Sequence, residues 1–264
     1  MISARNRENF ILSILKNKKG LRWTGLLVFF VFLVILDGNV FAFNVPEKLI
    51  FDLTWTGVKA GTATLEIVKE KGHAKIISTA RSADWLSTFY TVDDRIECIL
   101  KNTQTMSFIG LPENYRVKVR EGSHRRDKEA IFDHANRQVT FIDHLGNGRK
   151  TFKIRENTLD PLSGFYFIRT TTKYEVGKSI YVDIFDSKKL WNVEVQVLKK
   201  EKIKTKLGEF DTVVIKPLMK SEGIFNRKGD LYIWLTDDPR RIPVKMQSKV
   251  AVGAITATLV GGIY

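Results

Sequence analysis

The 264-residue chain is predicted to be all-β: a large antiparallel meander, curled into an open barrel or a two-sheet sandwich, with one short buried helix near residues 160–170. Apolar and polar residues alternate with period 2 in run after run from residue 49 onward, as in half-buried strands. Turn-forming Gly and Asn residues separate these runs at antiparallel spacing. About a dozen strands are too many for one flat sheet, so the sheet must curl or split.

The first 42 residues have the features of a signal peptide. A basic segment precedes the apolar run 26–36, and Val40-Phe41-Ala42 places small residues where signal peptidase requires them. The run is shorter than the roughly 20 apolar residues of a membrane span. We therefore expect cleavage after Ala42 and a single mostly-β periplasmic domain over residues 43–264, with an uncleaved membrane anchor as the alternative.

Charge and cysteine usage restrict the partners. The chain has 43 Lys and Arg against 29 Asp and Glu, and loss of residues 1–42 lowers the formal charge from +14 to +10. This balance favours acidic partners. The sole cysteine, Cys98, excludes an intrachain disulfide, and its alternating apolar context indicates a small buried hydrophobe rather than a nucleophile.

In the first half of the mature chain, Leu49, Phe51, Leu53 and Trp55 alternate with polar neighbours and predict the first strand. One helical turn is expected at residues 84–86. Further strands are predicted over residues 63–67, 74–81, 92–100, 105–109, 115–120, 128–133, 138–142 and 150–155.

A helix is predicted within the stretch from Thr158 to Thr170. Asp160 is a good N-cap, and Pro161 follows at the first helical position, where proline is tolerated. The helix is apolar nearly all round, so it must be buried, and Gly164 allows a backbone or ligand to approach closely. It either plugs the end of a β core or forms the wall of an apolar pocket.

Strand patterns resume after the helix. The alternation of Trp191, Val193, Val195 and Val197 with polar residues is the clearest in the chain and predicts one core face and one solvated face. The other strands of this half are predicted over residues 179–185, 210–217, 229–236, 244–252 and 254–260.

Four segments together resemble the domain-of-unknown-function 3108 family of exported bacterial proteins. They are LTWTGVKAGTATLEI (53–67), LDPLSGFYFIRT (159–170), KLGEFDTVVIKP (206–217) and GDLYIWLTDDPRRIPVKMQSKVAVGAITATL (229–259). The resemblance covers nearly the whole mature chain and implies a periplasmic, mostly-β single domain. It implies no reaction, ligand or catalytic residue.

Catalytic and metal-binding motifs are absent from the sequence: there is no Gly-x-Ser-x-Gly, His-Glu-x-x-His, phosphate-binding loop or cysteine pair. The pairs Asp133-His134 and Asp143-His144 are expected to lie roughly 20 Å apart along a hairpin, too far for one metal. The charged run 237–241 is expected to be a turn. We predict no catalytic residue, no cofactor and no metal.

Two strands carry basic residues on one face, which suggests a surface for anionic phospholipid, lipopolysaccharide or acidic glycan. The alternative is that lysines protect an exposed sheet edge from aggregation. Nucleic acid is disfavoured because no aromatic platform accompanies the lysines. The residues are Arg116, Lys118, Arg120, Lys200, Lys202, Lys204 and Lys206.

The leading functional hypothesis is a non-catalytic periplasmic cell-envelope protein that binds or carries an apolar or anionic envelope component such as a lipid. The candidate ligand-binding residues are Leu162, Phe165, Tyr166 and Trp234. The alternative is a structural or assembly partner in outer-membrane or surface-polysaccharide biogenesis. A hydrolase with an unfamiliar site is disfavoured by the missing motifs.

Overall fold

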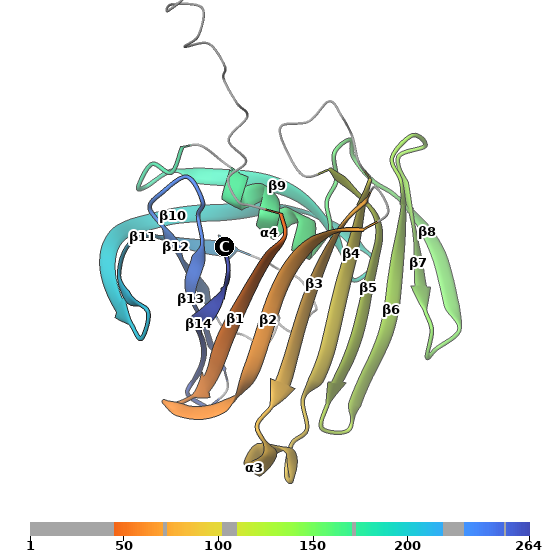
Figure 1. Cartoon of the computed structure of the whole chain (residues 1–264). Coiled ribbons are helices and arrows are strands. Elements are labelled where there is room, and N and C mark those ends of the chain that lie inside the picture. Colours follow the sequence, from red (N-terminus) through yellow and green to blue (C-terminus); the bar gives the residue numbers. More distant parts are fainter. Residues whose placement is uncertain (1–44, 71–72, 102–109, 171–172, 219–229, 251) are drawn as a thin grey trace, which may run out of the picture. The chain divides into compact units, whose positions relative to one another are not determined.

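A computed structural model describes residues 45–70, 73–101, 110–170, 173–218, 230–250 and 252–264, which all belong to the second of two compact units, Phe41–Tyr264. Its strands form one antiparallel sheet of fourteen strands (Figure 1), so the predicted all-β class is confirmed and the open barrel is the correct alternative.

The first half comprises β1 (Glu47–Trp55), β2 (Val58–Glu70), β3 (His73–Ser82), α3 (Asp84–Ser87), β4 (Asp93–Lys101), β5 (Leu111–Glu121), β6 (His124–Asp133), β7 (Gln138–Asp143) and β8 (Gly148–Lys153). The second half comprises α4 (Pro161–Thr170), β9 (Ser179–Asp186), β10 (Lys189–Thr205), β11 (Gly208–Leu218), β12 (Leu231–Thr236), β13 (Pro243–Lys249) and β14 (Ala254–Ile263).

The strand order is β8-β7-β6-β5-β4-β3-β2-β1-β14-β13-β12-β11-β10-β9. Each half is a meander, since every strand pairs with the next one along the chain. The first and last strands, β1 and β14, pair in the middle of the sheet. Helix α4 therefore lies in the connection that carries the chain from one sheet edge, β8, to the other, β9.

The inner face of the sheet follows from strand alternation. Leu49 and Phe51 of β1 point inward beside Leu65 of β2 and Leu259 of β14, and all four are at most 7% exposed. The sheet curls around α4, which contacts both β4 and β9 although these strands lie far apart in the strand order (Figure 1).

One isolated backbone bridge and several side-chain contacts link β9 to the other end of the sheet. Leu159 makes an isolated parallel bridge to Ile184 of β9, with backbone hydrogen bonds of 2.9 and 2.8 Å. Phe185 of β9 packs on Phe152 of β8, with ring centroids 5.6 Å apart, and the Lys188 ammonium lies 5.3 Å from the Phe141 ring centroid. The barrel thus remains open, since no strand ladder joins β8 to β9 among the described residues.

Several local predictions can be compared with the structure. Asp160 caps α4 as expected, since its Oδ1 accepts from the backbone amides of Leu162 (2.8 Å) and Ser163 (3.2 Å). The helical turn expected at 84–86 is α3, and the run 237–241 is a charge-paired turn. The predicted strand 105–109 and the signal segment 1–42 lie outside the described residues.

The C-terminal end of α4 is held by a buried ion pair that the sequence did not reveal. Arg169 donates from Nη1 and Nη2 to the two carboxylate oxygens of Glu47, each at 2.7 Å, and both residues are at most 1% exposed. The same guanidinium donates to the carbonyls of Arg240 and Arg241. The helix is therefore fixed to the start of β1 and to the turn before β13.

We predict that Glu47→Gln and Arg169→Met each lower the free energy of unfolding by about 3–5 kcal/mol, because each leaves a buried charge without its partner. Combining Glu47→Gln with Arg169→Met should cost clearly less than the sum of the two single changes. Urea unfolding of the single and double variants measures this coupling. The exposed pair Arg137–Glu156 is the control, since Glu156→Gln should cost less than about 1 kcal/mol. Equal losses of stability for Glu47→Gln and Glu156→Gln would contradict the prediction.

Candidate functional site

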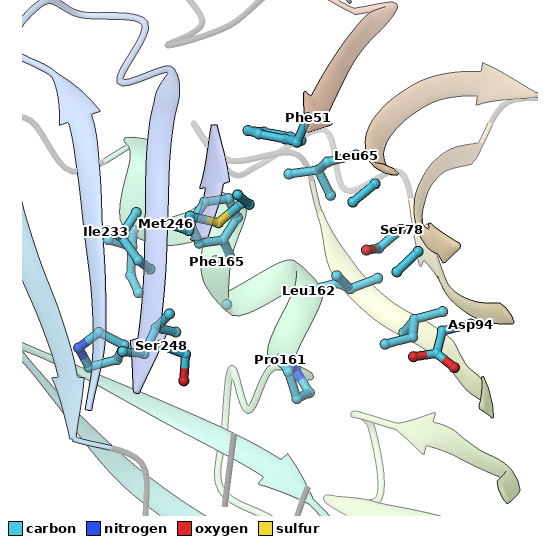
Figure 2. Close-up of a pocket in the computed structure, with 18 of the residues that line it drawn as sticks. Phe51, Leu65, Ser78, Asp94, Pro161, Leu162, Phe165, Ile233, Met246 and Ser248 are labelled. Carbon is cyan, nitrogen blue, oxygen red and sulfur yellow. The ribbon is translucent and has the colours of Figure 1, made fainter. Parts of the chain in front are cut away.

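The curled sheet and α4 line an apolar cavity of about 330 Å³ that is partly open to solvent. Its walls come from both halves of the sheet: β1 to β5 on one side and β9 to β14 on the other. Figure 2 shows Phe51, Leu65, Ser78 and Asp94 on one side of α4, with residues of the second half of the sheet on the opposite side. A cavity of this size and composition suits a small apolar ligand or part of a longer chain.

Helix α4 turns Leu162 and Phe165 towards the cavity, and both side chains are only half-buried (Figure 2). The absence of a side chain at Gly164 lets the helix lie against β9, because a Cβ there would stand 2.3 Å from Cδ1 of Ile184. The helix is therefore a wall of the cavity and not solely a plug.

The other two predicted ligand-binding residues do not line the cavity. Tyr166 is fully buried on another side of α4, where its hydroxyl donates to Glu47 at 3.2 Å and its ring packs under Arg169. Trp234 alternates with the cavity-lining Ile233 and so lies on the opposite face of β12. Its indole N–H donates to a carboxylate on β10 at 2.7 Å.

One charged side chain lines the cavity among the described residues, and it is Asp94 of β4. The residue is 7% exposed, and its Oδ1 accepts from the backbone amide of Arg120 at 3.0 Å. Burial raises the pKa of this carboxyl to about 6; the Arg120 amide and the positive charge of Arg126 oppose the shift, and the negative charge of Glu121 adds to it. The carboxyl therefore changes its charge just below neutral pH.

A second buried carboxyl lies behind the helix and does not line the cavity. The Asp160 carboxylate accepts from the Cys98 thiol at 2.9 Å and from the Ser163 hydroxyl at 2.5 Å. Burial raises the pKa of Asp160, and burial together with the Asp160 charge raises the pKa of the Cys98 thiol well above its usual value. Cys98 is thus a buried, protonated thiol that anchors the helix cap, in line with its predicted structural role.

The basic residues predicted as an anionic surface lie on β5, β10 and the turn after β10. Among the described residues, 199–205 of β10 pair with β11 alone, so this part of the strand is an edge of the described sheet, whereas β5 lies between β4 and β6. Edge protection therefore fits the β10 lysines but not the β5 residues, and the anionic surface stays a prediction. Four of the seven contact carboxylates: Arg116–Asp127 at 2.9 Å, Lys200–Asp237 at 2.6 Å, Lys202–Asp211 at 3.8 Å and Lys206–Asp52 at 3.6 Å.

The histidines singled out in the sequence have protein partners. His134 contacts the Pro112 carbonyl at 2.9 Å, and His144 contacts the Glu129 carboxylate at 2.8 Å. Within the part of the chain that the structure describes, no three His, Cys, Asp or Glu residues are placed to hold a metal ion. No helix in that part is long and apolar enough to cross a bilayer.

Sequence reasoning missed Asp94, although a signal for it was present. Asp94 has the same strand parity as Ile96, Cys98 and Leu100, so a carboxyl on an otherwise apolar face was visible in the pattern. The contributions of β9 to β14 were not visible, because which strands face one another depends on the strand order.

A comparison with protein-family models assigns this chain to a family. The family model described as "Protein of unknown function (DUF3108)" matches residues 50–260. The chain belongs to this family, as its sequence motifs indicated. A search of curated proteins found no match.

Among solved structures, the chain resembles a beta-barrel-like protein of domain of unknown function DUF1849 from Brucella abortus. The TM-score is 0.54 at 13% sequence identity, and the alignment covers 84% of this chain and 99% of that one. At this identity the likeness concerns the fold alone.

We predict that Phe165→Ala lowers the free energy of unfolding by less than the roughly 3–5 kcal/mol typical of a packed aromatic, because Phe165 already borders a cavity. Phe185→Ala is the matched control, since Phe185 is 1% exposed and packs on Phe132 and Phe152; it should show the full loss. Urea unfolding of both variants measures the difference. An equal loss for the two would mean that α4 is a packed plug.

We predict a pH-dependent gain in stability for Asp94→Asn. The pKa of Asp94 is about 6 in the folded protein against an ordinary value of 3.8, so its ionisation opposes folding progressively from about pH 4 to pH 6 and fully above that range. The variant should exceed the parent by about 1–3 kcal/mol at pH 7, and this advantage should vanish near pH 4.

Comparing variant with parent at each pH cancels contributions from Asp160 and Asp186, whose pKa values burial also raises. Asp93→Asn removes a neighbouring, exposed carboxyl and should lack this pH-dependent gain. A pH-independent difference for Asp94→Asn would refute the assignment.

Proposed function

We propose that this protein is a non-catalytic periplasmic cell-envelope protein that holds one apolar component, such as a lipid chain, between α4 and the inner face of the sheet. The observation that carries the proposal is the cavity of about 330 Å³, whose lining is mostly aliphatic and aromatic. Its wall includes Leu162 and Phe165, which are only partly buried on the cavity side of α4. Apolar side chains left facing a cavity gain contacts when a ligand fills it.

The arrangement of polar groups supports binding rather than catalysis. A nucleophile or general base must lie within hydrogen-bond reach of a partner group at a site open to substrate. The buried Cys98–Asp160–Ser163 cluster caps α4 and is absent from the cavity lining. The periplasmic location rests on the basic and apolar pattern of residues 1–42.

A second candidate is a structural or assembly partner in the cell envelope, favoured by the unpaired edge of β8. Five of the six residues of this strand are exposed, and no described strand pairs with its outer side. Such an edge can accept a strand from another protein. Its residues Arg149, Lys150 and Lys153 weaken this alternative, since basic side chains on an edge discourage pairing.

The test is to fill the cavity and measure the binding of N-phenyl-1-naphthylamine, a neutral apolar fluorescent probe. Ala63 lines the cavity, whereas its neighbour Thr62 is exposed and has the opposite strand parity. Ala63→Phe should abolish saturable one-site binding, because the new ring occupies the ligand volume, and Thr62→Phe should leave binding unchanged.

Native mass spectrometry of protein purified from the periplasm should show a co-purified apolar molecule in the parent and in Thr62→Phe only. Absence of probe binding in the parent, or equal binding in both variants, would refute the proposal.

A further inference from the structure

The charge lining the cavity is opposite in sign to that of the chain as a whole. The chain carries a formal charge of +14, yet among the described residues no Lys, Arg or His side chain lines the cavity. The charged group there is the carboxyl of Asp94. Basic residues of the neighbouring strands lie on the outer face: Arg95 and Lys75, for example, contact Glu97, which has the opposite strand parity to Asp94.

The carboxyl of Asp94 is only partly satisfied by the protein. Its Oδ1 accepts from the Arg120 amide, and no described residue donates a hydrogen bond to its Oδ2. The residue is 7% exposed, so solvent reaches it little. Its Oδ2 is not one of the fully buried side-chain atoms without a partner, so it can be reached from the cavity, where a carboxylate oxygen favours a hydrogen-bond donor.

Strand pairing places a second polar side chain on the same wall. Asp94 lies opposite Ala80, and Ser78 lies opposite Ile96, so Ser78 and Asp94 are diagonal neighbours on the inner faces of β3 and β4. Both line the cavity, and Figure 2 shows them on the side of α4 away from Ile233 and Met246. The small side chain of Ala80 leaves the space beside Asp94 open to a ligand.

We propose, building on the function proposed above, that the cavity selects an amphiphile whose polar end is a hydrogen-bond donor, an alcohol or an amine, and that this end binds to Asp94 and Ser78. The apolar remainder of the ligand extends along α4 towards Ile233 and Met246. A ligand with an anionic end, a carboxylate or a phosphate, meets like charge and no cationic partner in the described lining. Above pH 6 the Asp94 carboxyl is ionised and only accepts hydrogen bonds, which sharpens this preference.

The test compares dodecylamine, dodecanol and dodecanoate, which share one alkyl chain and differ in the end group. Each displaces N-phenyl-1-naphthylamine from the full mature protein at pH 7.5. In the parent, the amine and the alcohol should bind about tenfold or more tightly than dodecanoate, as expected for a hydrogen bond to a buried charged acceptor. Non-specific attraction to a basic protein would give the reverse order.

The decisive variant is Asp94→Asn, which retains an acceptor for the Arg120 amide and should reduce the difference between amine and dodecanoate to about twofold or less. Asp94→Ser serves as a second variant if the first does not fold. The matched control is Asp93→Asn, which removes one exposed carboxyl on the outer face and should keep the full difference.

The outcomes separate this inference from the function on which it rests. Equal binding of the three ligands by the parent, tighter binding of dodecanoate, or an unchanged preference in folded Asp94→Asn would each overturn the inference and leave an apolar carrier in place. Failure of the parent to bind the probe or any of the ligands would overturn both.

Discussion

The ion pair between Glu47 and Arg169 joins residues 122 positions apart and determines where α4 lies inside the sheet. Both groups are almost completely removed from solvent, so the pair is stable only with near-ideal geometry and further hydrogen bonds. Both conditions are met: two contacts of 2.7 Å join the charges, Tyr166 donates to the carboxylate, and two backbone carbonyls accept from the guanidinium. The helix cannot shift without breaking several of these contacts.

This constraint explains how an apolar cavity persists beside the helix. Apolar walls gain dispersion energy when a cavity collapses, so α4 would move towards the sheet if it were free to do so. The Glu47–Arg169 pair holds its C-terminal end, and the hydrogen bond that the Cys98 thiol of β4 donates to Asp160 holds its N-terminal end. Polar contacts at the two ends thus provide the stability, which allows Leu162 and Phe165 between them to remain incompletely packed.

Period-2 alternation was sufficient to predict the all-β class and the strands that the structure describes, and the Asp160 cap with Pro161 and the apolar run after it predicted the buried helix, because these depend on local sequence. The identity of the cavity residues was only partly predictable. Leu162 and Phe165 line the cavity, but the orientation of Trp234 depends on which face of β12 points inward, and that is set by the strand order. Nothing in the sequence indicated that Arg169, at the end of an apolar helix, would be buried against a carboxylate on β1.

Strand parity separates charge between the two faces of the sheet, and this changes what the net charge implies about function. Because successive side chains point to opposite faces, Arg95 and its acidic partner Glu97 lie on the outer face, while Asp94 and Ile96 lie on the inner one. Water screens the outer charges within about 8 Å at physiological ionic strength, whereas the environment of Asp94 screens far less. The net charge therefore describes the outer face of the sheet, whereas the proposed ligand selection rests on Asp94, the one charged side chain in the described lining of the cavity.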